Sequence, residues 1–143
     1  MTIRELLVAF SKKSGNELRD ICRENLDKVH GYLVETRVSE EYRKTFVQGI
    51  WKLFVSADRK TRGDEYNLFI YSIGFTKEEF SQDQFYDMTN EGSDENFVNW
   101  MIRETNKMPK DIAFAVCTIG VCIMSVDEDV SDSEVELLSK FFR

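Results

Sequence analysis

Four acidic residues of this 143-residue chain recur as two pairs at one spacing, and together they could bind a metal ion. Asp58 and Glu65 form the first pair, and Asp127 and Glu134, each 69 residues further along, form the second. Hard divalent cations require several carboxylate or carbonyl oxygens around them. One pair supplies too few, whereas two pairs brought together by a duplicated fold would supply four carboxylates.

Both acid pairs lie in the same local context, which indicates a duplicated helix–turn–helix unit. In each copy an apolar run ends at Ser-x-Asp, with Ser56 aligned on Ser125, and a polar connector follows. The glutamate then opens a second apolar-periodic run. A helix end followed directly by a helix start also exposes free backbone carbonyls, which are further oxygen ligands. Asp129 and Asp132 add two more acids to the second connector.

Two other interpretations compete with a metal site at the second turn. Ser131 and Glu134 form a capping-box sequence, which satisfies free amides at a helix start without any metal. An EF-hand loop starting at Asp127 is excluded, because Asp132 stands where that loop needs glycine. Leu138 moreover occupies the position of the bidentate glutamate of such a loop.

The elements that must position these acids are all predicted to be helices. One proline and seven glycines leave long segments uninterrupted, and the apolar periodicity predicts a compact single all-α domain of two pseudo-symmetric helix–acidic turn–helix repeats. Capping signatures begin at Thr2, Thr76 and Ser131, and Pro109 fits a first helical turn. The eight expected helices span about residues 2–12, 16–35, 42–57, 64–73, 76–89, 97–104, 109–126 and 132–142.

Composition predicts a cytoplasmic protein with one substantial core. The apolar content is 42%, and the most apolar run, residues 112–126, is too short to span a membrane. No secretory signal is evident at the N-terminus. Cys22, Cys117 and Cys122 form no CxxC motif, so we expect buried thiols in a reducing compartment.

The net charge of −7 is unevenly distributed along the chain. Residues 1–62 carry a balance of +4, whereas residues 63–143 carry −11. Because the acidic half would repel phosphates, nucleic-acid binding is disfavoured. A divalent cation or a protein partner with a basic face fits this half better, and the oligomeric state is left open.

Catalytic motifs are absent from the sequence, so we expect a protein that is not an enzyme. No Walker loop, GxGxxG, HExxH or GxSxG is present. His30, the only histidine, has a surface-like helical context, and a catalytic pairing would need it beside a cysteine or a serine. A hydrolase using the carboxylates with a metal-bound water is the remaining enzymatic alternative.

The duplicated stretches resemble the TerB-like family, named for tellurite-resistance TerB and including domains similar to the N-terminal region of the co-chaperone DjlA. Its hallmark is an apolar helix that ends in an Ala-Asp-Gly-type turn, followed by a glutamate opening the next helix, twice in the domain. The matching stretches are residues 55–58 with Glu65 and residues 124–127 with Glu134. The resemblance covers about residues 40–143, while residues 1–38 form N-terminal helices outside it.

The resemblance implies a function in stress response or tellurite resistance without catalysis. It also implies a divalent cation (Ca²⁺, Mg²⁺, Mn²⁺ or Zn²⁺) at Asp58, Glu65, Asp127 and Glu134.

This chain departs from the family pattern at both turns. Arg59 and Glu128 stand where the family has the turn glycine, and Lys60 and Arg62 bring positive charge to the first turn. There the cation would either bind weakly or be replaced by Lys60 or Arg62 in an internal ion pair. The alternative function is then a metal-free helical interaction module that uses its acidic C-terminal half.

Overall fold

Apolar side chains at every third or fourth position give each segment one buried face, and all regular structure in the described ranges is helical. The structure is a computed structural model that describes residues 2–55, 63–73, 80–90, 94–126 and 131–141. The predicted compact all-α fold is therefore confirmed. The helices are α1 (Ile3–Ser11), α2 (Gly15–Glu35), α3 (Glu40–Val55), α4 (Gly63–Ile73), α5 (Gln82–Asn90), α6 (Glu95–Asn106), α7 (Lys110–Ser125) and α8 (Asp132–Phe141).

Side-chain caps determine where several helices begin. The Thr2 hydroxyl accepts the Glu5 amide at 3.1 Å at the start of α1, as predicted. Ser14 and Glu17 form a complete capping box at α2, which the sequence analysis did not predict. Pro109 is the N-cap residue of α7 and so precedes its first turn, one position earlier than predicted.

The start of α5 differs from the prediction. The helix begins at Gln82, because the Ser81 hydroxyl accepts the Gln84 amide and the Gln84 side chain accepts the Ser81 amide in return. Ser-x-x-Gln forms the same reciprocal capping box as Ser-x-x-Glu, and here it sets the start of the helix. The predicted cap at Thr76 lies outside the described residues.

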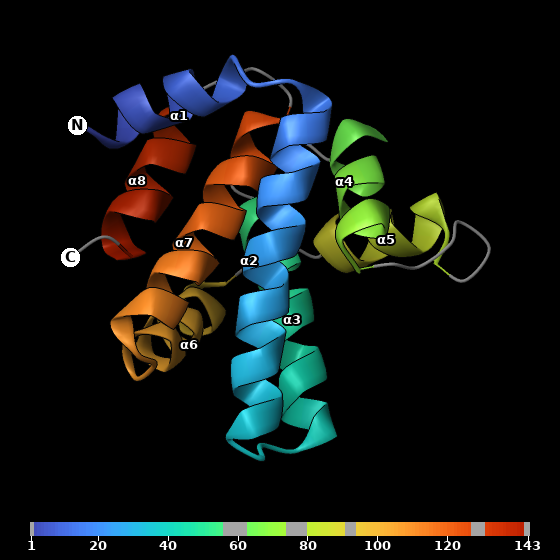
Figure 1. The fold of residues 1–143 in the computed structure, drawn as a ribbon, viewed down its shortest axis with the longest axis vertical. Helices are drawn as coiled ribbons and strands as arrows, with labels where there is room; N and C mark the ends of the chain where they lie inside the picture. Colours follow the sequence, from blue (N-terminus) through green and yellow to red (C-terminus); the bar gives the residue numbers. More distant parts are fainter. Residues whose placement is uncertain (1, 56–62, 74–79, 91–93, 127–130, 142–143) are drawn as a thin grey trace.

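Helix α7 lies at the centre of the fold and carries the most continuous run of buried residues. It runs antiparallel to α2, and α1, α3, α6 and α8 also pack against it (Figure 1). One hydrophobic core joins residues from α1 and α2 with residues from all later helices. Helices α1 and α2, which precede the stretch of the predicted family resemblance, thus pack into the same core as the other described helices.

The two halves of the predicted duplication have matching elements. Helices α3 and α7 are each 16 residues long, and α4 and α8 are 11 and 10 residues long. Buried positions also correspond: Ile50 with Ile119, and Leu68 with Leu137. The described part of the structure therefore repeats a long helix followed by a shorter one.

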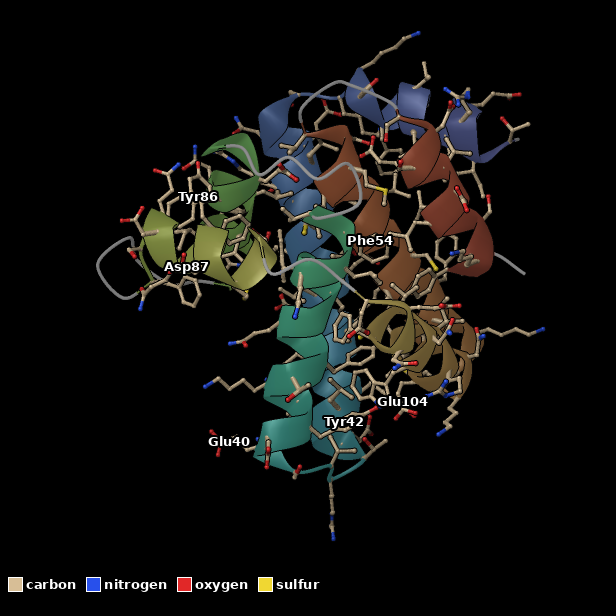
Figure 2. The ribbon with its side chains drawn as sticks, turned by 180° about the vertical axis from the view of Figure 1, so that it is seen from behind. Glu40, Tyr42, Phe54, Tyr86, Asp87 and Glu104 are labelled. Carbon is tan, nitrogen blue, oxygen red and sulfur yellow. The ribbon has the colours of Figure 1, made fainter. Side chains whose placement is uncertain are left out.

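A hydrogen-bonded aromatic cluster joins α3 to α6. The Tyr42 hydroxyl donates to Glu104 Oε1 at 2.8 Å. Figure 2 shows the two residues close together, where α3 begins and α6 ends. The Trp100 ring contacts the rings of both Tyr42 and Phe46 edge-on, with centroids 6.0 Å and 6.3 Å apart. Lys107 Nζ donates to Glu104 Oε2 at 2.9 Å, which completes the polar edge of the cluster.

No helix in the described ranges is long and apolar enough to cross a membrane.

Candidate functional site

Glu65 and Glu134 occupy the same position in the two repeats and are both buried. Each is the third residue of its helix, Glu65 in α4 and Glu134 in α8, and each is only 2% exposed. Both helices bury the next turn as well, through Leu68 in α4 and Leu137 in α8. A glutamate in the first turn of a helix interacts favourably with the helix dipole, but near-complete burial of a carboxylate also requires specific partners.

The partners of Glu134 include the predicted cap. Glu134 Oε1 accepts the Ser131 amide at 2.9 Å and lies 3.1 Å from the Ser131 hydroxyl, which in turn accepts the Glu134 amide at 3.2 Å. The capping box is therefore confirmed and accounts for one carboxylate oxygen.

The first repeat lacks this serine. Three residues before Glu65 the sequence has Arg62, whose side chain has no acceptor for a helix amide. Burial of Glu65 therefore recurs without the serine half of the capping box. Around it, the Tyr66 hydroxyl donates to the Phe80 carbonyl at 2.6 Å, which anchors the first turn of α4.

The two glutamates lie at the same end of the molecule, on helices that flank the central pair. Figure 1 shows α4 and α8 on opposite sides of α2 and α7, with their N-terminal ends both toward the end where α1 crosses. Helix α4 packs on α2 and α5, and α8 packs on α7, α1 and α6. The helix turns that carry the two glutamates are thus at one end of the fold, on opposite sides of the central helices. The other two predicted ligands, Asp58 and Asp127, lie outside the described residues.

Helix α1 contributes a positive charge to this end. The Arg4 guanidinium hydrogen-bonds to Asp132, which the sequence analysis named as an additional candidate ligand. The Asp132 side chain is 97% exposed, so this ion pair is screened by water and contributes little to stability. Asp132 therefore has a cationic partner already within the chain.

The described part of the chain contains no cluster of three or more histidine, cysteine or acidic side chains that could hold a metal ion. The end of the fold where α4 and α8 begin, here called the acidic end, carries two buried carboxylates, Glu65 and Glu134. Both are hard oxygen donors. Such donors favour Mg²⁺, Ca²⁺ or Mn²⁺ over Zn²⁺, which prefers nitrogen and sulfur ligands. The described residues do not bring these two carboxylates together, since α4 and α8 lie on opposite sides of the α2–α7 pair, and the four-carboxylate site stays a prediction.

The only histidine and the cysteines do not come together. His30 is exposed on α2, whereas Cys22, Cys117 and Cys122 are all buried and free. Burial raises the pKa of Cys22 and Cys117 to about 12, and the neighbouring Ser72 hydroxyl offsets part of the rise at Cys22. Neutral buried thiols of this kind are poor nucleophiles.

Ser125 is a further buried polar residue at the acidic end of the fold, beyond the four predicted ligands. Ser125, the last residue of α7, is 1% exposed, and its hydroxyl has no hydrogen-bond partner within the described ranges. In the sequence, Ser125 is marked by its alignment with Ser56, since each serine lies two residues before the aspartate of its turn.

The fold and the site define a class: a small all-α protein with a duplicated long-helix–short-helix unit and a buried glutamate at the same place in each copy. Comparison with known proteins adds no family to this description, since no protein-family model, no curated protein and no solved structure matches the chain.

Proposed function

We propose that this chain is a non-enzymatic, TerB-like stress-response protein that binds a divalent cation at its acidic end. The observation that carries the proposal is the pair of buried glutamates, Glu65 and Glu134, at equivalent positions of two repeats and at one end of the fold. A single buried first-turn glutamate is adequately explained by capping. Its recurrence at the equivalent position of the other repeat, with the same near-complete burial, supports a shared role for both.

In this function Asp58 and Asp127 coordinate the cation, and Glu65 and Glu134 either coordinate it or orient the ligands that do. The cation links the ends of the two repeats. Since binding stabilises the folded state by mass action, a free cation at about 100 times its Kd adds about 2.7 kcal/mol to the free energy of unfolding. For a chain of this size this corresponds to a rise of roughly 5–10 °C in Tm.

The test is thermal unfolding of the full chain in EDTA and then with Mg²⁺, Ca²⁺, Mn²⁺ or Zn²⁺ added singly. We expect a cation-specific rise in Tm, with the hard cations more effective than Zn²⁺. The Asp58→Asn/Asp127→Asn and Glu65→Gln/Glu134→Gln double variants should each lose that rise.

A matched control separates coordination from a change in net charge. Asp83→Asn/Asp87→Asn removes two exposed acids from α5, away from the acidic end, and should keep the full cation response. An unchanged Tm of the wild-type protein with every cation would contradict the proposal. So would a response that the control loses as completely as the acidic-turn variants.

A metal-free interaction module is the second candidate, and a specific surface feature favours it. Phe114 on α7 is 63% exposed, the highest value among the large apolar side chains the structure describes. With the −11 balance of residues 63–143, such a surface suits a basic partner with one apolar contact. Salt-sensitive binding of a basic oligolysine probe, unaffected by EDTA and weakened by Phe114→Ser, would support this function over cation binding.

A further inference from the structure

Two arginines of α2 and a tyrosine of α4 form an exposed cluster where these helices pack. The guanidinium carbons of Arg19 and Arg23 lie 5.8 Å and 5.6 Å from the centroid of the Tyr71 ring, within the range of cation–π attraction. The Tyr71 hydroxyl donates to Asp20 at 3.2 Å, which holds the ring against α2. Because Tyr71 is 39% exposed, this arginine–tyrosine cluster is open to solvent.

The cluster is suited to bind carboxylates. Neither guanidinium group makes an ion pair or a hydrogen bond with the residues that the structure describes. A guanidinium group over an aromatic ring keeps its N–H donors available, since they lie in its own plane. The ring also restrains two long side chains that would otherwise lose rotamer freedom on binding. The arginines are therefore preorganised for carboxylates, which a guanidinium group binds through two parallel hydrogen bonds.

Helix α5 carries the complementary charges. Asp83 and Asp87 are both exposed and lie four residues apart, the same spacing as Arg19 and Arg23, and α5 contains no basic residue. Residues at this spacing are neighbours on one helix face, and like charges there destabilise the helix. Each pair is thus a local cost that a pair of opposite charge offsets. No ion pair joins the two pairs within one copy, as far as the described ranges extend.

The two helices that carry these charge pairs both contact α4. Helix α4 packs on α2 and on α5, and its Tyr66 ring lies 5.7 Å from the Phe85 ring of α5 between centroids. Figure 1 shows α4 and α5 together on one side of α2. One copy therefore has a basic and an acidic helix next to the same third helix. In a twofold arrangement each copy gives and receives the same contact, and the interface is closed.

We propose that this chain forms a dimer in which the arginine pair of α2 in one copy binds the aspartate pair of α5 in a second copy, with Tyr71 inside the contact. The partner is a second copy because the charges of one chain complement each other: +4 over residues 1–62 and −11 over residues 63–143. Tyrosine and arginine are also enriched among the residues that contribute most to protein interfaces. The inference does not depend on cation binding at the acidic end.

Sedimentation equilibrium of the full chain in EDTA, over a range of protein concentrations, measures this association. We expect a monomer–dimer equilibrium at low salt whose Kd rises by at least about tenfold at about 0.5 M NaCl, because salt screens exposed charges. The variants Arg19→Glu/Arg23→Glu and Asp83→Lys/Asp87→Lys should each stay monomeric. A wild-type protein that is monomeric at low salt would overturn the inference, as would undiminished association of either variant.

A mixture of the two charge-reversed variants tests the pairing itself. Each variant alone brings like charges together, whereas in the mixture the introduced glutamates meet the introduced lysines and the remaining native pairs meet each other. Equimolar mixing should therefore restore a dimer. Circular dichroism of each variant verifies the helical fold beforehand. Folded variants that fail to associate on mixing would overturn the pairing.

The matched control is Lys28→Glu/Lys44→Glu. It reverses two exposed basic side chains of α2 and α3 and changes the net charge as much as the double arginine variant does. We expect it to dimerise with the Kd of the wild-type protein. A loss of dimer as complete as in the arginine variant would assign the effect to net charge and would overturn the inference.

Discussion

Phe54 of α3 and Gly120 of α7 are in contact where the two repeats cross. A β-carbon built on Gly120 would lie 2.6 Å from two carbon atoms of the Phe54 ring, so only glycine fits under that ring. Phe54 also packs on Phe141 of α8 at a centroid distance of 5.5 Å, and Figure 2 shows it near the upper end of α3. The repeat is asymmetric here, because the first copy has Trp51 where the second has Gly120.

We predict that Gly120→Ala destabilises the protein by about 1–3 kcal/mol, because the added methyl group overpacks a filled core. The Phe54 ring is 1% exposed, so it cannot move aside into solvent. Urea unfolding monitored by circular dichroism measures the change.

Gly31→Ala is the matched control for this prediction. Gly31 lies within α2, and a β-carbon there meets no atom within 4 Å. We expect stabilisation by about 0.5–1 kcal/mol, since alanine is the better helix former. Equal effects of the two substitutions would contradict the packing account of Gly120.

Stability should depend on Ser131, which caps α8, and not on Ser133, two residues further along the chain. Ser131→Ala deletes the acceptor of the Glu134 amide and should lower the free energy of unfolding by about 1 kcal/mol. Ser133, an exposed residue in the first turn of the same helix, makes no comparable bond in the described ranges, and Ser133→Ala should change stability by less than about 0.5 kcal/mol. Chemical unfolding in EDTA keeps any cation effect out of this comparison.

Glu104 should make stability depend on pH in the acid range. The hydrogen bonds from the Lys107 ammonium and the Tyr42 hydroxyl hold the pKa of Glu104 below its ordinary value of 4.5. A carboxyl group whose folded pKa is depressed stabilises the fold above the unfolded pKa and loses that contribution as pH falls through the folded pKa. Glu104→Gln should therefore be less stable than the wild type at about pH 7, and the difference should shrink below about pH 4.5. A difference independent of pH would contradict this account.

The thiols should be unreactive until the protein unfolds. Burial raises the pKa of Cys22 and Cys117 to about 12 and raises that of Cys122 as well, so native thiolate is scarce at neutral pH. A thiol reagent should label none of the three cysteines in the native protein and all three in denaturant. Because unfolded thiols ionise near 9.0 while the folded ones stay neutral, stability should also fall as pH rises above about 9. Rapid native labelling of any cysteine would contradict this prediction.

The helices and most of their starts could be predicted from the sequence because the signals for them are local. The cap at Thr2 and the box at Ser131 need only residues three positions apart, and both formed as predicted. The predicted start of α5 was wrong, although its signal is equally local: the Ser81–Gln84 capping box sets the start at Gln82. The internal repeat also correctly anticipated the matched pairs of helices, because apolar periodicity records which face each helix buries.

The site was only partly accessible to such reasoning. The sequence indicated acids at equivalent positions, but burial of Glu65 and Glu134 depends on how α4 and α8 pack against other helices of the fold. The hydrogen bond from Tyr42 to Glu104 joins residues 62 positions apart, and no local pattern predicted it.

By itself the sequence determined an all-α chain, its caps and a duplicated acidic turn, since backbone hydrogen bonding and apolar spacing act over a few residues. Only the tertiary structure decided that α4 and α8 flank the α2–α7 pair with both buried glutamates at one end. It also left the Ser125 hydroxyl buried without a partner among the described residues. Burial and hydrogen-bond satisfaction depend on how distant helix faces meet, and the packing of the whole core determines that meeting.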